Sequence, residues 1–203
     1  MSTLYHVSEE ANIDRFEPRM PPTKIATVEV PVVWAVADTH LANYLLPRHC
    51  PRVAYRSSPG TSEQDRERFL GVDPEAKIVA IEARWFGYAS TAPLWLYEFP
   101  STTFVCNDAT AGYFVSYSPV VPSSRRCIER PLSELLASGA ELRVVPSLLG
   151  LASAVASSTL AFSCIRMRNA GLGPHAVQPF AQPDLREKPR RPVGSTSGDL
   201  WKR

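Results

Sequence analysis

The chain consists of short apolar runs separated by polar and proline-rich segments. β-Branched and aromatic residues dominate most of these runs, and such residues favour the half-buried surface of a sheet. The pattern predicts strands at residues 3–8, 28–36, 51–57, 76–85, 92–100, 102–108, 112–122, 126–131 and 140–146. Nineteen prolines against ten glycines add stiff connections and argue against a helical bundle.

Helical signals are fewer. Some apolar residues recur three and four positions apart, and one segment starts with proline and ends on glycine, as helices often do. The expected helices lie at residues 39–46, in the second half of 58–71, at 131–139 and at 147–170. The last is predicted as one long C-terminal helix, because apolar residues from Leu148 to Ile165 keep helical spacing.

Many strands with few, irregularly placed helices predict an α+β fold with a mostly antiparallel sheet. We expect a single domain over residues 1–170, followed by a disordered Pro/Gly/Ser-rich tail at 171–203. The sequence contains neither GxGxxG nor GxxxxGK[ST]. A Rossmann or P-loop nucleotide site is therefore not expected.

Charge and cysteine usage bear on partners and compartment. Six basic and three acidic residues fall in 171–203, so the tail carries a net charge of +3 and residues 1–170 about −1. The domain thus lacks the basic excess of a nucleic-acid-binding protein, and only the tail could make such contacts. The four cysteines are widely spaced, and neither a secretory signal nor a membrane span is apparent. We therefore expect a cytoplasmic protein with reduced thiols and no membrane partner.

Three stretches resemble ADP-ribosyltransferase-like proteins. "LYHVS" at residues 4–8 is similar to that superfamily's first motif, a strand ending in His-x-Ser or His-x-Thr. "VVWAVADTHLANYLL" and "GYFVSYSPVVP" resemble the next two motifs. The resemblance implies an ADP-ribosyltransferase-like architecture and NAD as the cofactor. By position, His6 and Ser8 would then line the adenosine-ribose side of a cleft.

The third motif departs from the superfamily's pattern. Its catalytic glutamate aligns with Gly112 and Tyr113, and neither is acidic. Without a carboxylate aimed at the developing cation, transition-state stabilisation falls by a few kcal/mol, about hundreds-fold in rate. Glu98 on the preceding strand is the candidate replacement, so His6 and Glu98 form the predicted catalytic pair.

Further binding roles follow from residue chemistry. Arg15 and Arg19 offer planar forks of donors to a pyrophosphate, although surface pairing with Glu17, Glu9 or Glu10 is the plainer alternative. Trp34 and Tyr113 would present aromatic faces to a ring of the nucleotide.

Two other polar clusters have chemical readings. "PRHCPR" at residues 47–52 could hold a nucleophilic Cys50 beside His49, or a buried structural thiol. "IRMRNA" at 165–170 could set Arg166 and Asn169 on one helix face, or simply be a cationic helix end.

A wider resemblance covers residues 3–170. "LYHVSEE", "VWAVADTHLANYLLPRHCPRV", "ELRVVPSL" and "STLAFSCIRMRNA" look like an uncharacterised family of small bacterial and fungal proteins. The sequence thus predicts a nucleotide-handling protein that binds NAD and carries out a modified transfer, a hydrolysis or no reaction. The alternative is a non-catalytic accessory or interaction protein, for example in a biosynthetic pathway.

Overall fold

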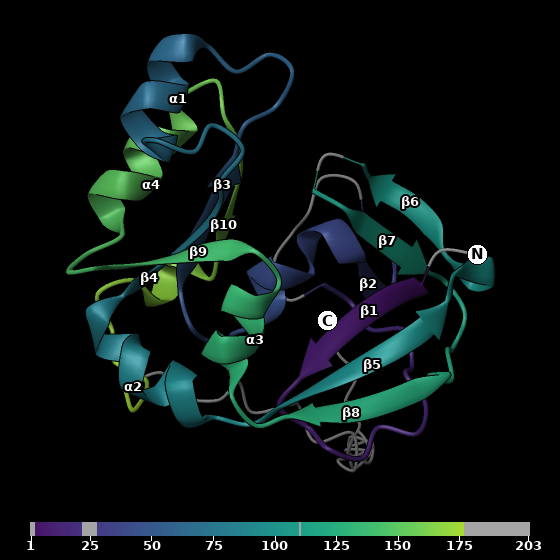
Figure 1. The fold of residues 1–203 in the computed structure, drawn as a ribbon. Coiled ribbons are helices and arrows are strands. Elements are labelled where there is room, and N and C mark those ends of the chain that lie inside the picture. Colours follow the sequence, from purple (N-terminus) through teal and green to yellow (C-terminus); the bar gives the residue numbers. More distant parts are fainter. Residues whose placement is uncertain (1–2, 22–27, 110, 177–203) are drawn as a thin grey trace, which may run out of the picture.

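The computed structural model describes residues 3–21, 28–109 and 111–176, and the strands in them form two sheets (Figure 1). The six-stranded sheet is antiparallel throughout, in the order β6 (Val105–Asp108), β7 (Tyr113–Ser116), β2 (Val33–Ala37), β1 (Thr3–Ser8), β5 (Leu94–Pro100), β8 (Ser124–Ile128). The four-stranded sheet has the order β10 (Ala161–Ile165), β3 (Arg52–Arg56), β4 (Lys77–Glu82), β9 (Ala140–Val145), with β4 and β9 parallel. The predicted α+β class with mostly antiparallel pairing is confirmed.

Short helices connect and cover the sheets. They are η1 (Asp38–Tyr44), α1 (Glu63–Leu70), α2 (Ala83–Thr91), η2 (Ser101–Thr103), α3 (Pro131–Ala137), α4 (Leu149–Ala156) and η3 (Met167–Asn169). Helices α1 and α4 lie together against one face of the four-stranded sheet (Figure 1). The other face of that sheet packs toward the six-stranded sheet, with α2 and α3 contributing Trp85 and Leu135 to the shared core.

The prediction of one long helix over 147–170 is wrong. Helix α4 ends at Ala156, and strand β10 and the short η3 follow. The Ser157 and Ser158 hydroxyls bond to the carbonyls of Ser153 and Val155, which caps and closes the last helical turn. Beyond them, residues 161–165 alternate between partly buried and exposed, as an edge strand does.

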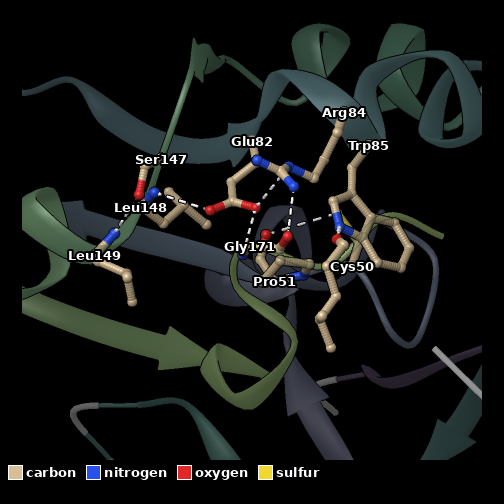
Figure 2. A network of polar contacts seen from close by, with 10 residues as sticks. Cys50, Pro51, Glu82, Arg84, Trp85, Ser147, Leu148, Leu149 and Gly171 are labelled. Carbon is tan, nitrogen blue, oxygen red and sulfur yellow. Dashed lines mark hydrogen bonds and ion pairs between the residues drawn. The ribbon is translucent and has the colours of Figure 1, made fainter. Parts of the chain in front are cut away.

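Helix α2 was not expected, because residues 76–85 read as one strand. The strand ends at Glu82, whose side chain is fully buried. As Figure 2 shows, its carboxylate accepts hydrogen bonds from the backbone N–H groups of Leu148 (3.2 Å) and Gly171 (2.9 Å), and Arg84 Nε lies 3.4 Å away. Trp85 Nε1 donates to the carbonyl of Leu172. These contacts anchor the segment after β10 to the end of β4.

Strand alternation gives the six-stranded sheet two different faces. In β1, Tyr5 and Val7 pack toward the core between the sheets, whereas Leu4 belongs to the apolar cluster on the other face. That other face is covered by Phe16 and Val120, which pair with each other through their backbones. The predicted disordered tail lies, from residue 177 onward, outside the described residues.

Candidate functional site

His6 lies on β1, on the face covered by Phe16. Its Nδ1–H donates to the carbonyl of Trp34 at 2.9 Å. The ring is partly buried and makes an edge contact with Phe16, with the centroids 4.9 Å apart. Burial lowers the pKa of His6, although the bond to Trp34 opposes this shift. The histidine is therefore neutral at pH 7 and packed among aromatic rings.

The structure does not bring His6 and Glu98 together. Across the β1–β5 pair, His6 stands opposite Tyr97, and Tyr5 stands opposite Glu98. Because paired residues point to the same face and successive residues alternate, His6 and Glu98 project from opposite faces of the sheet. Ser8 shares the face of His6, and its Oγ accepts a hydrogen bond from the backbone N–H of Glu10.

Arg15 and Arg19 lie at the surface. Arg15 Nε pairs with Glu17 at 2.7 Å, with both side chains more than half exposed, so the surface-pair alternative is confirmed for Arg15. Arg19 pairs through its backbone with Val32, and its side chain is exposed. Its charge contributes to lowering the pKa of His6, after burial and Arg48.

Trp34 and Tyr113 come together, on the face opposite His6. Their rings meet edge-on with centroids 5.8 Å apart. Tyr44 on η1 completes the group, because its hydroxyl donates to that of Tyr113 at 2.5 Å. Burial and the neighbouring Tyr113 raise the pKa of Tyr44 well above its usual value. We call Trp34, Tyr44 and Tyr113 the aromatic group; the sequence indicated its first and third members.

Four arginines gather beside the aromatic group, and with His49 we call them the arginine cluster: Arg48, Arg52, Arg166 and Arg168. Arg52 is the most deeply buried arginine of the cluster, and it is only 3 % exposed. Its guanidinium donates to the carbonyls of Asn43, Pro47 and Cys50 and lies 5.6 Å from the centre of the Tyr44 ring. These bonds fix the loop between η1 and β3, which also carries Arg48 and His49.

Arg166 joins the cluster through strand pairing. Ile165 is the partner of Arg52 across β10 and β3, so Arg166 leaves the strand beside this loop. Its backbone is left-handed, with φ at 55°, unlike any other described residue that is not glycine. Burial, with Arg48, Arg168 and Arg52, lowers the pKa of Arg166 to about 10. Among the described residues no carboxylate forms an ion pair with it.

His49 lies among these cations. Its carbonyl accepts from Asn169 Nδ2 at 2.7 Å, whereas its buried Nδ1 has no hydrogen-bond partner within the described residues. Burial and Arg166 lower the pKa of His49, and Glu9 opposes this effect. The Glu9 carboxylate is itself engaged by the backbone N–H of Arg48 and the hydroxyl of Tyr88.

A small cavity of about 40 Å³ lies between η1 and the β3–β10 edge, next to His40 and Arg56. Arg56 donates to His40 Nε2 at 2.7 Å, which leaves Nδ1 to donate to the Thr39 hydroxyl. Gly112 abuts this ring: a Cβ on Gly112 would lie 2.3 Å from His40 Nδ1, and φ is +68°. An acidic side chain at this third-motif position is therefore excluded by the fold. The cavity has room for water, not for a nucleotide.

Cys50 is a structural thiol. It is fully buried, and its Sγ donates to the carbonyl of Pro51 at 3.6 Å. Burial raises its pKa to about 12, despite the nearby Arg52. Such a thiol is protonated at pH 7 and is not a nucleophile.

Residues 3–21, 28–109 and 111–176 contain no group of three or more His, Cys, Asp or Glu side chains arranged to hold a metal ion. None of their helices has the length and apolar character needed to cross a bilayer.

Comparison with known proteins identifies the family. A model described as a family of unknown function (DUF6886) matches residues 5–170. This match spans most of the sequence, so the chain belongs to that family. The expected membership of an uncharacterised family is thereby confirmed. No curated protein and no solved structure gives a significant match.

Proposed function

We propose that this member of a family of unknown function binds a nucleotide with a pyrophosphate group, such as NAD. The phosphates lie in the arginine cluster, and a ring of the ligand lies against the aromatic group. The observation that carries the proposal is Arg166. It has no ion-pair partner among the described residues, and it is held in a left-handed conformation close to three other arginines.

Concentrated, partly buried positive charge is unfavourable unless an anion offsets it. A left-handed backbone at a non-glycine residue costs about 1–3 kcal/mol and tends to occur where function requires it. Guanidinium groups match phosphate oxygens with two parallel donors, which a point charge cannot do. Together these features support an anion as the ligand, and a phosphate in particular.

The aromatic group supports a ligand with a ring. Arg166 lies close enough to Tyr44 to affect its pKa, so the cationic and aromatic surfaces are continuous. Trp34, Tyr44 and Tyr113 are each partly exposed and can offer a ring edge or face to a base. Nucleotides combine phosphate and aromatic ring within one molecule.

The same proposal includes an ADP-ribosyltransferase-like architecture. The three strands that carry the resembling motifs, β1, β2 and β7, are neighbours in the order β7-β2-β1. Adjacent strands are what three motifs lining one site would need, and this supports the likeness.

Two observations favour binding without transfer, as in a non-catalytic accessory protein. Phe16 packs against His6, and Glu98 projects from the opposite face. Gly112 has no room for the carboxylate that the transfer reaction uses. The proposed role is therefore recognition of the nucleotide rather than cleavage of its glycosidic bond.

The test is calorimetric titration of NAD into the wild type, Arg166→Ala and Arg15→Ala. We expect Arg166→Ala to weaken binding about 10- to 100-fold, because a hydrogen bond to a charged group contributes about 1.5–3 kcal/mol. Arg15→Ala, the matched surface arginine that the sequence favoured, should bind as the wild type does. Equal loss in both variants, or none in either, contradicts the proposed site.

His6→Ala extends the same experiment. The proposal requires that it retain NAD binding once circular dichroism shows an intact fold. If His6→Ala loses binding while Arg166→Ala keeps it, the ligand lies at the first sequence motif instead.

A further inference from the structure

The buried Nδ1 of His49 is an unusual feature of this molecule. Among the described residues, only one other buried side-chain nitrogen or oxygen, Arg66 Nε, lacks a hydrogen-bond partner. A buried polar atom left without a partner costs about 1–3 kcal/mol, so folded proteins rarely keep one without a reason. The position of His49 is fixed through its backbone rather than through its ring, because Asn169 Nδ2 donates to its carbonyl.

The charged groups around the ring come from three parts of the chain. Arg48 precedes it on the same loop, Arg166 and Arg168 come from the turn after β10, and Glu9 follows β1. Three of these four groups are cations. Their field and the burial of the ring keep the imidazole neutral at pH 7.

We infer that nucleotide binding at the arginine cluster is coupled to proton uptake by His49, whose ring turns so that the protonated Nδ1 donates to a phosphate oxygen. No hydrogen bond to a described residue holds the Nδ1 of the ring in its present position. This inference rests on the proposed function. The proton comes from solvent and adds to the free ring nitrogen, which converts neutral imidazole to imidazolium. No covalent bond of the ligand changes.

The physical reason is a reversal of the local field. A pyrophosphate among Arg48, Arg166 and Arg168 replaces net positive surroundings with negative ones. It also supplies the acceptor that Nδ1 lacks. Both effects favour the charged imidazolium, so the pKa of His49 rises on binding.

The direction of the pH dependence follows from linkage. The complex holds up to one more proton than the free protein at pH values between the pKa of His49 in the free state and its higher value in the complex. Within that window the Kd rises by up to about tenfold for each unit of increasing pH. Below and above the window the Kd is independent of pH. Because the pKa of His49 in the free protein is lowered from the ordinary 6.5, the window begins at weakly acidic pH, and it extends upward to the pKa of His49 in the complex.

NAD is a suitable probe, because its phosphodiester groups keep a constant charge from about pH 5.5 to 8.5, where histidine titrates. Calorimetric titrations over this range, repeated in buffers of different ionisation enthalpy, measure both the affinity and the protons taken up. The wild type should take up a substantial fraction of one proton near pH 7. His49→Gln, which keeps a neutral donor, should bind NAD with no proton uptake and a flat pH profile.

His175→Gln serves as the matched control, because His175 is exposed and lies outside the cluster. It should reproduce the wild-type profile. Thermal unfolding of each variant shows that the fold is intact.

The outcomes separate the two proposals. If the wild type fails to bind NAD at every pH, the proposed function is overturned, and this inference falls with it. If the wild type binds NAD through Arg166 with no proton uptake, or if His49→Gln keeps the wild-type uptake, the inference alone is overturned.

Discussion

The hydroxyl of Tyr44 donates to the hydroxyl of Tyr113 at 2.5 Å and thereby joins η1 to β7. The same Tyr44 ring lies over the guanidinium of Arg52. Tyr44 is thus the link between the aromatic group on the six-stranded sheet and the arginine cluster at the start of β3. Removal of either hydroxyl should therefore alter the packing of both the aromatic group and the arginine cluster.

The Tyr44 hydroxyl makes stability sensitive to alkaline pH. Burial and Tyr113 raise the pKa of Tyr44 in the folded state, while the unfolded chain ionises near 10. Above that value the unfolded state releases a proton that the folded state keeps, so folding stability falls as pH rises. We therefore expect the free energy of unfolding of Tyr44→Phe to fall less steeply than that of the wild type between about pH 10 and 11.

Chemical denaturation of wild type and Tyr44→Phe at several alkaline pH values measures this difference. Tyr117→Phe is the control, because Tyr117 is exposed. Parallel declines in all three proteins would contradict the assignment to Tyr44.

We expect Arg166 to lower the stability of the fold and to strengthen the binding of NAD. Arg166→Gly relieves the left-handed backbone and removes one charge from a cationic cluster, effects worth about 1–2 kcal/mol at the backbone alone. The melting temperature should rise by about 2–8 °C, while NAD binding should weaken by about 10- to 100-fold, as in Arg166→Ala. Differential scanning calorimetry and titration on one sample test both halves of this prediction. A lower melting temperature would mean that the Arg166 side chain stabilises the fold.

Most strands could be predicted because their β-branched and aromatic runs are local signals. The arginine cluster could not be predicted, because it depends on the contact between two distant segments. The sequence marked "PRHCPR" and "IRMRNA" separately, and the pairing of Ile165 with Arg52 unites them. A helix over residues 161–165, as the apolar spacing predicts, excludes that pairing. Phe162 and Ile165 keep helical spacing by chance, and the serine-rich break at Ser157 was the signal against it.

The predicted His6 site shows a different limit of sequence reasoning. Its strand was correctly placed, but Phe16, only ten residues away, packs on the histidine and fills the space beside it. The pairing of Tyr5 rather than His6 with Glu98 depends on the β1–β5 register. Neither fact can be derived from the motif, because register and long-range packing are tertiary properties.

Glu82 should be among the most costly single truncations. Glu82→Ala leaves the N–H groups of Leu148 and Gly171 without their acceptor and removes the carboxylate from Arg84, which keeps its bond to the Gly171 carbonyl (Figure 2). The two backbone hydrogen bonds to the buried carboxylate contribute about 1.5–3 kcal/mol each, so the expected loss is about 3–5 kcal/mol, and each kcal/mol lowers the melting temperature by about 2–4 °C. Urea denaturation measures the loss.

Glu67→Ala provides the comparison, because Glu67 is exposed on α1. It should change stability by less than about 0.5 kcal/mol. Similar losses in both variants would show that the Glu82 contacts do not stabilise the fold.

Thiol labelling should distinguish Cys50 from the other three cysteines. Cys106, Cys127 and Cys164 are exposed, whereas Cys50 is buried and its pKa is raised to about 12. Iodoacetamide at neutral pH should modify the exposed thiols and spare Cys50 until the protein is unfolded. Peptide mass spectrometry over time reads each site separately. Alkylation of Cys50 in the native protein as fast as that of Cys127 would restore a nucleophilic role.

Gly112 is the position where the fold and the transferase chemistry exclude each other. In Gly112→Ala the new Cβ would meet the ring of His40 at 2.3 Å, at a backbone angle that alanine rarely adopts. The ring cannot move freely, because Arg56 and Thr39 hold its two nitrogens. We expect a loss of about 1–3 kcal/mol from overpacking, in addition to about 1 kcal/mol from the left-handed backbone.

Gly139→Ala separates these two contributions. Gly139 has φ at +80°, but a Cβ there would meet no atom within 4 Å. It should show the backbone cost alone, so Gly112→Ala should be the less stable variant in urea denaturation. The double variant Gly112→Ala with His40→Ala should recover the overpacking loss, because the clashing ring is gone. If Gly112→Ala is no less stable than Gly139→Ala, then His40 does not close this position to larger side chains, and an acidic residue could be introduced there.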